Sequence, residues 1–166
     1  MVQLWVNLPA KDKMTPPKYQ EITHGKMGNW QLENDKGVVE VIAGEYNGVK
    51  GPAATFTPLQ VYNARLKKDA KIGFSFPATY NTGILVVEGS ATINGTLAPT
   101  DHFVLFKNDG EQIEVETTDD TILLILSGEP IDEPIAQYGP FLMNTWQELE
   151  QAIEDVSAGK FGVLEE

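Results

Sequence analysis

The 166-residue chain contains no cysteine and only two histidines, His24 and His102. The absence of cysteine excludes a disulfide framework, a thiolate zinc site and a cysteine nucleophile, and it is typical of a reducing compartment. Protein sites for iron, copper or zinc usually gather several imidazole or thiolate donors around one ion. Two histidines cannot supply a three-histidine metal site within one chain.

Long apolar runs and an excess of basic residues are also missing. No run of about 18 apolar residues occurs, which predicts no membrane span. The first residues, MVQLWVNLPAKDK, lack a cationic start followed by an apolar stretch, so no signal peptide is expected. We predict a cytoplasmic protein, or one that is both cytoplasmic and nuclear in a eukaryotic cell.

Acidic residues outnumber basic residues by twenty-four to twelve, which gives a net charge of −12. Nucleic-acid affinity comes largely from lysine and arginine, and the main basic cluster here is Arg65–Lys68, so no direct nucleic-acid binding is expected. An acidic soluble surface is the favoured interpretation, and binding to a basic protein partner is the alternative.

Short apolar stretches separated by turn residues dominate the chain. The run Ser90–Ile93 ends at Asn94-Gly95, a pair suited to a type I′ turn, so it should form a hairpin with the chain after Thr96. Many short strands with no helix between them indicate an antiparallel sandwich or barrel. The expected strands are Val2–Leu8, Val38–Ile42, Ala54–Thr57, Gln60–Leu66, Lys71–Phe76, Gly83–Val87, Ser90–Ile93, His102–Phe106, Gln112–Glu116 and Thr121–Ser127.

The C-terminal part changes to helical periodicity. Thr145 and Glu148 have the spacing of a capping box, and Gly159 is a plausible stop, which predicts a helix over residues 145–158. Its apolar stripe is Trp146, Leu149, Ile153 and Val156. Packing of this stripe against the barrel is favoured over a partner groove. Four residues are nonetheless candidates for an interface: Trp5, Trp146, Leu149 and Ile153.

Three segments, QLWVNLPAKDKMTPPKYQ at 3–20, VIAGEYNGVKGPAATFTP at 41–58 and LSGEPIDEPIAQYGPFLMNTWQELEQAIEDVSAGKFG at 126–162, closely resemble the pirin family. The resemblance implies an all-β cupin barrel (a double-stranded β-helix of jelly-roll type) with one C-terminal α-helix. Residues 1–166 would be a single domain equivalent to the C-terminal cupin of pirins. It would comprise a crossover strand and connector (1–20), a barrel (38–127) and a helix (145–158).

The resemblance also tells where a cupin would place its metal ligands. Counting back from Gly89, those positions carry Ser75, Phe76, Pro77, Ala78 and Thr82, and a later histidine would fall near 110–112, where only Glu111 could ligate. We therefore predict no metal, no cofactor and no catalytic residue. In pirins the three-histidine, one-glutamate site lies on an N-terminal cupin, which has no counterpart in these 166 residues.

Two weaker site hypotheses remain. A small apolar pocket at the barrel mouth would involve Phe74, Phe76, Tyr80 and His102, although ordinary core packing is favoured. Asp132 and Glu133 are paired carboxylates of the type used in general acid–base catalysis, but their setting between two prolines favours a rigid loop.

The resemblance implies two activities for whole pirins: regulation through protein contacts, and quercetin 2,3-dioxygenase activity with iron or copper. For this chain we predict a non-catalytic, metal-free interaction or scaffold module. The alternatives are part of a dioxygenase whose metal site lies on a missing N-terminal cupin, or a small-molecule-binding cupin. The expected partners are a second copy, with or without exchanged N-terminal strands, a metal-bearing N-terminal cupin, or a regulatory protein.

Overall fold

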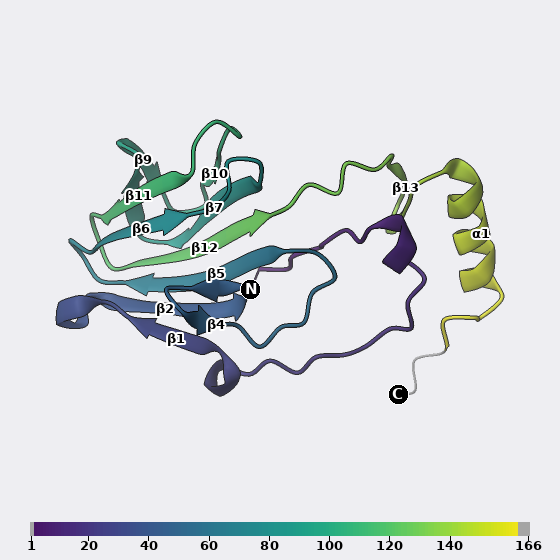
Figure 1. Ribbon diagram of the computed structural model, residues 1–166, viewed down its shortest axis with the longest axis horizontal. Helices are drawn as coiled ribbons and strands as arrows, with labels where there is room; N and C mark the ends of the chain where they lie inside the picture. Colours follow the sequence, from purple (N-terminus) through teal and green to yellow (C-terminus); the bar gives the residue numbers. More distant parts are fainter. Residues whose placement is uncertain (1, 163–166) are drawn as a thin grey trace. The chain divides into compact units, whose positions relative to one another are not determined.

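The computed structural model describes residues 2–162 of the chain (Figure 1). They form two compact units. The sandwich unit runs from Lys18 to Pro130, and the terminal unit combines the chain up to Pro17 with the chain from Ile131 onward. None of the helices described is long and apolar enough to cross a membrane.

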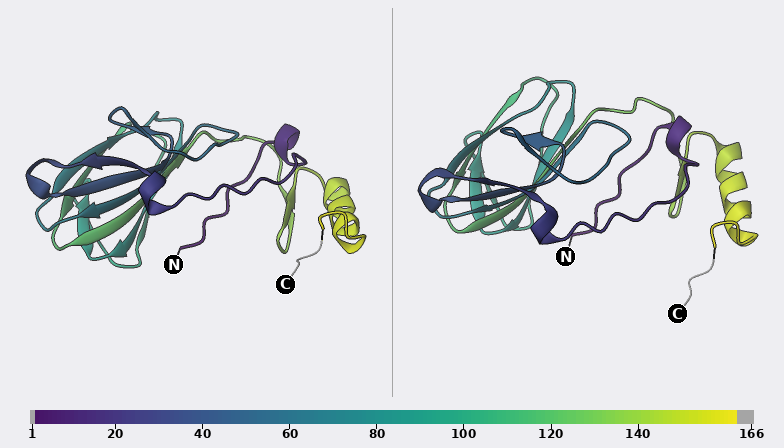
Figure 2. Two further views of the ribbon diagram at one scale, coloured as in Figure 1. Left: turned by 90° about the horizontal axis from the view of Figure 1, so that it is seen from below. Right: turned by 60° about the horizontal axis from the view of Figure 1, so that its bottom comes forward.

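The sandwich unit is built from two antiparallel sheets that lie over each other (Figures 1 and 2). The larger sheet has the order β1 (Gly28–Gln31), β2 (Gly37–Ala43), β5 (Leu59–Leu66), β12 (Thr121–Gly128), β7 (Asn81–Glu88) and β10 (Phe103–Leu105). The smaller sheet has the order β6 (Lys71–Ser75), β11 (Gln112–Thr117), β8 (Ser90–Ile93) and β9 (Thr96–Pro99). A short hairpin of β3 (Glu45–Tyr46) and β4 (Val49–Lys50) and the 3-10 turns η2 (His24–Lys26) and η3 (Glu33–Asp35) complete this unit.

Side chains from both sheets share one core. Alternation along β5 turns Tyr62 and Ala64 inward, and the same period along β6 turns Phe74 inward. Aromatic rings run through this core: Tyr46 lies 5.3 Å from Phe74, and Phe74 stacks on Phe76 with ring centroids 6.5 Å apart. The mostly-β fold is therefore as expected from the sequence, although the two sheets are not hydrogen-bonded into one closed barrel.

The predicted hairpin is confirmed. Strands β8 and β9 pair in register from Ser90 opposite Pro99 to Ile93 opposite Thr96. Asn94 has φ 46° and Gly95 has φ 79°, so both central residues are left-handed, as a type I′ turn requires.

Two predicted strands are wrong. Val2–Leu8 and Ala54–Thr57 form no strand in the structure, because neither segment enters a ladder of hydrogen bonds with a neighbouring strand. Conversely, the edge strand β1, whose sequence GNWQ has little strand character, and the short hairpin of β3 and β4 were not predicted. Alternation of apolar and polar residues predicts an extended conformation, but it does not identify the strand with which a segment pairs.

The terminal unit contains the 3-10 turn η1 (Ala10–Asp12), a hairpin of β13 (Ala136–Tyr138) and β14 (Phe141–Met143), and helix α1 (Trp146–Ser157). The capping box is confirmed, because the Thr145 side chain accepts a bond from the Glu148 amide and the Glu148 carboxylate accepts one from the Thr145 amide.

Helix α1 packs on β13 and β14 within the terminal unit. The apolar stripe is only partly used in this packing. Leu149 and Ala152 are buried, Ile153 is half-buried, and Trp146 is 64% exposed. Trp5, in the same unit, is 69% exposed.

The core packing predicts a large effect for Phe74→Ala. The side chain is 1% exposed and contacts the rings of Tyr46, Tyr62 and Phe76, so its truncation should lower the free energy of unfolding by about 3–5 kcal/mol. Urea unfolding measures the change. The matched control is Leu97→Ala on β9, which is 61% exposed and should shift stability by less than about 0.5 kcal/mol. Equal effects of the two variants would contradict the assigned core.

Candidate functional site

The positions that carry metal ligands in cupins hold no suitable donors here. Phe76 is buried in the core, and Thr82 is a buried hydroxyl whose Oγ1 lies 2.7 Å from Oγ of Ser127, so the two satisfy each other. Ser75 and Glu111 are exposed. Among residues 2–162, no group of three histidine, aspartate or glutamate side chains is placed to hold a metal ion. The residues present do not fit the iron or copper of a cupin dioxygenase.

The two histidines lie in separate surroundings. His102 is exposed, with Nδ1 3.1 Å from the carbonyl oxygen of Thr100. His24 belongs to η2, and its Nδ1 lies 2.9 Å from Oε1 of Glu40 on β2. Neither histidine has a second imidazole as a neighbour, because these are the only two in the sequence and they contact different elements.

The predicted barrel-mouth pocket corresponds to a cavity of about 80 Å³. Phe76 and Tyr80 line it, together with Thr82, Phe106 and Ile113. Phe74 lies in the core against Phe76, and His102 is not among the lining residues. Ligand pockets usually enclose about 300–1,000 Å³, so this cavity is small for an organic ligand.

The paired carboxylates of the GEPIDEP segment hold the terminal unit together. Oε2 of Glu133 accepts a hydrogen bond from the Ala10 amide at 2.7 Å and another from Nδ2 of Asn144 at 2.8 Å. Glu133 thus joins two parts of the chain that are far apart in sequence. Asp132 is exposed, with a left-handed φ of 52°. Their geometry agrees with the rigid-loop interpretation.

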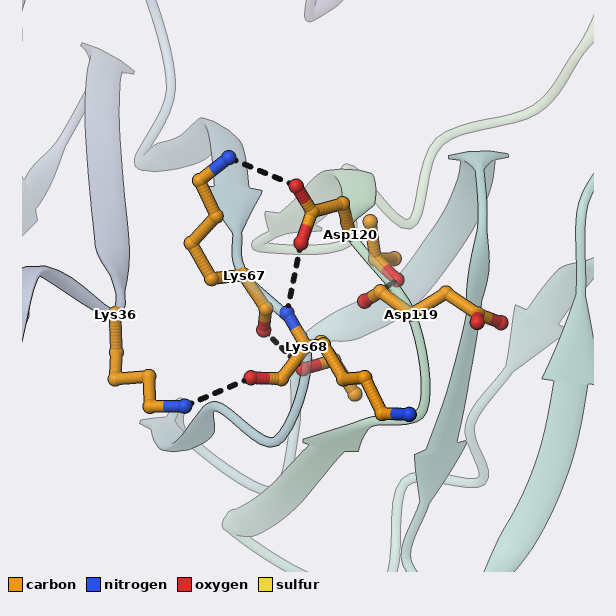
Figure 3. Close-up of polar contacts among 7 residues, drawn as sticks. Lys36, Lys67, Lys68, Asp119 and Asp120 are labelled. Carbon is orange, nitrogen blue, oxygen red and sulfur yellow. Dashed lines mark hydrogen bonds and ion pairs between the residues drawn. The ribbon is translucent and has the colours of Figure 1, made fainter.

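The basic run of the sequence is engaged in internal contacts (Figure 3). Asp120 accepts hydrogen bonds from Nζ of Lys67 at 2.8 Å and from the Lys68 amide at 3.0 Å. Both bonds lower the pKa of the Asp120 carboxyl below its usual range, and the bond from Lys67 has the larger effect. Lys36 donates to the carbonyl oxygen of Lys68 at 2.9 Å. The side chains of Lys36 and Lys67 and the backbone of Lys68 therefore connect turns at one end of the sandwich unit.

A buried charge on the large sheet escaped the sequence analysis. Glu40 is only 2% exposed although its side chain is on the outer side of the sheet, beside Asn63. Its Oε2 accepts hydrogen bonds from Nδ2 of Asn63 and from Nε of Arg65, the latter at 3.3 Å. Its Oε1 faces His24 without hydrogen-bond geometry. The available signal was a glutamate in the middle of the apolar strand sequence GVVEVIA.

The outer side of the large sheet also carries a continuous set of apolar side chains. Leu124 on β12 pairs with Leu85 on β7, and Leu85 pairs with Phe103 on β10. In the next row, Leu126 lies between Val61 and Gly83, and Gly83 pairs with Leu105. The Phe103 ring lies against Gly83, where an added Cβ would come within 2.3 Å of it. We define the outer apolar face as Val61, Leu85, Phe103, Leu105, Leu124 and Leu126.

Comparison with known proteins identifies the family. Residues 61–162 match the model of the pirin C-terminal cupin domain. The chain belongs to the pirin family. The crystal structure of a quercetin 2,3-dioxygenase from Acinetobacter baumannii superposes with a TM-score of 0.92 at 38% identity, and the match covers 97% of this chain and 56% of that one.

Plant pirins are similar to this chain over the same extent. A pirin-like protein of Solanum lycopersicum is 36% identical over 165 residues, and Pirin-1 of Arabidopsis thaliana is 34% identical over 167 residues. Each match covers 97% of this chain but only 56% of the tomato protein and 58% of the Arabidopsis protein. This pirin-family chain therefore spans little more than half the length of the relatives it matches.

The buried tyrosines of the sandwich unit predict a stability loss at high pH. Burial raises the pKa of Tyr46 to about 12 and raises the pKa of Tyr62 as well. The unfolded chain releases the Tyr46 proton near pH 10, so the stability due to the neutral side chain is complete below about pH 10 and is lost as pH rises to about 12.

The variant Tyr46→Phe should make this loss shallower, because phenylalanine cannot ionise. Urea unfolding at a series of pH values between about 9 and 12 measures the free energy of unfolding of both proteins. Tyr19→Phe is the control, since Tyr19 is 88% exposed and should leave the slope unchanged. Identical slopes for Tyr46→Phe and wild type would contradict the assignment.

Proposed function

We propose that this chain is a non-catalytic cupin module of a pirin-type protein, and that it acts as a scaffold by docking its outer apolar face onto another folded domain. The observation that carries the proposal is the outer apolar face itself. Phe103 is 54% exposed and Leu105 is 73% exposed, on a sheet whose other side is already packed.

The residue pattern of strand β12 supports the proposal that another domain covers the outer apolar face. An antiparallel sheet with one side in water alternates apolar and polar residues, whereas a strand covered on both sides is apolar throughout. The sequence of β12 is TILLILSG, in which Leu123 and Ile125 are inward and Ile122, Leu124 and Leu126 are outward. Contiguous exposed apolar surfaces of this kind mark interaction sites.

The relatives are longer than this chain, and their additional residues are the proposed source of the docked domain. The A. baumannii dioxygenase contains a further 44% of chain that this protein does not match, since the match covers 56% of it. We propose that a domain equivalent to that remainder covers the outer apolar face. The terminal unit has exposed aromatic residues of its own, since Trp5, Tyr138 and Trp146 are 69%, 67% and 64% exposed.

The residues at the cupin ligand positions favour assigning any dioxygenase chemistry to the docked domain and not to this chain. Phe76 and Thr82 offer no imidazole where a cupin ligand would stand, so this chain would contribute shape and contact. Metal analysis of purified protein together with flavonol turnover tests this assignment. Stoichiometric iron, copper or nickel with turnover by the chain alone would overturn it.

A chimera tests the docking proposal. It would carry this chain in place of the matching part of the A. baumannii dioxygenase, and we expect amide hydrogen exchange in β10 and β12 to be slower in the chimera than in the chain alone. Phe103→Ser/Leu105→Ser should destabilise docking by about 2–5 kcal/mol, because two apolar side chains lose their buried contact. Leu97→Ser, on an exposed position of the small sheet, is the matched control. Unchanged exchange rates in the wild-type chimera would contradict docking.

Without such a domain, a second copy is the proposed occupant of the exposed apolar surfaces. We expect the isolated chain to be a homodimer in light scattering, with Trp146→Ser shifting it toward monomer. Tyr19→Ser removes an aromatic ring that is 88% exposed in the other unit and should leave the mass unchanged. A strict monomer at high concentration would contradict this expectation.

A further inference from the structure

The outer side of the large sheet carries one arginine that a buried carboxylate holds in place. We propose that Arg65, positioned by Glu40, is the residue that sets the register and specificity of docking, and that its terminal amino groups donate to a neutral acceptor, such as a backbone carbonyl, on the docked domain. This inference rests on the docking function proposed above.

Strand register puts Arg65 beside the outer apolar face. On β5 it follows Val61 and Asn63 on the outward side, and it pairs with Ile122 of β12 on one side and Val38 of β2 on the other. Ile122 precedes Leu124 along the outward side of β12. A domain that covers Leu124 would therefore reach Arg65 as well.

The Glu40 carboxylate limits the positions that the Arg65 guanidinium group can take. The carboxylate is 2% exposed and accepts a bond from Nε of Arg65, whereas the Arg65 side chain itself is 52% exposed. Guanidinium has five N–H donors in a fixed plane. The contacts described for Arg65 use Nε alone, so the terminal amino groups remain for a partner.

A surface depression beside Arg65 gives an acceptor room to approach. It has a volume of about 240 Å³ and is lined by Arg65, Leu66, Lys67, Glu88, Asp120, Thr121 and Ile122. Lys67 is bound to Asp120, so the two neutralise each other. Arg65 is neutralised by Glu40, and Glu88 adds a negative charge. This balance favours an uncharged acceptor over a carboxylate.

The pairing explains how the docked domain would be selected. Burying a guanidinium without an acceptor leaves unpaired donors at the interface, which costs free energy, so a domain that lacks the acceptor or docks in another register is disfavoured. Arginine is also enriched among the residues that dominate interface energies. Apolar contact alone would not impose one register, because it is non-directional.

The chimera described above provides the test, with amide exchange of β10 and β12 as the measure of docking. Arg65→Gln alone would leave Glu40 buried without its cation, so the decisive variant is Glu40→Gln/Arg65→Gln, which removes both charges. We expect it to reduce the docking-dependent protection at least about tenfold, the loss expected for hydrogen bonds from a charged donor. Lys50→Gln, an 80% exposed cation of the same unit, is the matched control.

The outcomes separate the two proposals. Protection in the wild-type chimera that is lost in the double variant supports the role of Arg65. Equal protection in both overturns that role and leaves the docking function standing, whereas no protection in the wild-type chimera overturns the docking function and the inference with it. A fall in protection of more than about tenfold between low and high salt would overturn the neutral acceptor, because salt screens a charged pair at an interface.

Discussion

Strand β12 carries apolar side chains on both of its faces, and only its inward face is fully packed within this chain. Its inward residues, Leu123 and Ile125, are fully buried in the shared core of the two sheets. Its outward residues, Ile122, Leu124 and Leu126, are only half-buried within this chain. A sheet whose central strand is apolar on both sides gains free energy from a second covering layer. The matched part of the relatives is only 56% of their length, and the proposed covering layer is a domain equivalent to the remainder.

Aromatic side chains fill the core of the sandwich unit. Rings of Tyr46, Tyr62, Phe74 and Phe76 contact one another through the interior, where a metal-binding cupin would direct imidazoles. The cavity lined by Phe76 and Tyr80 has a volume of about 80 Å³, and the buried hydroxyls of Thr82 and Ser127 satisfy each other. The interior described by these contacts is therefore occupied by packed side chains.

In each unit, one carboxylate accepts hydrogen bonds from more than one neighbouring group. In the sandwich unit, Glu40 restrains Arg65 and Asn63 on the outer side of the sheet. In the terminal unit, Glu133 connects the Ala10 amide to the Asn144 side chain. Removal of Arg65 would leave the desolvated charge of Glu40 without that partner, which is destabilising.

The sequence by itself determined the features that depend on neighbouring residues. The Asn94-Gly95 turn, the Thr145–Glu148 capping box and most strands were predictable because turn geometry, capping and alternation act over a few residues. Missing imidazoles at the cupin ligand positions were equally visible. Only the tertiary structure decided that Val2–Leu8 forms no strand, that β1 does, and that Glu40 meets Arg65 and His24. Those outcomes depend on partners distant in the chain, which local patterns do not specify.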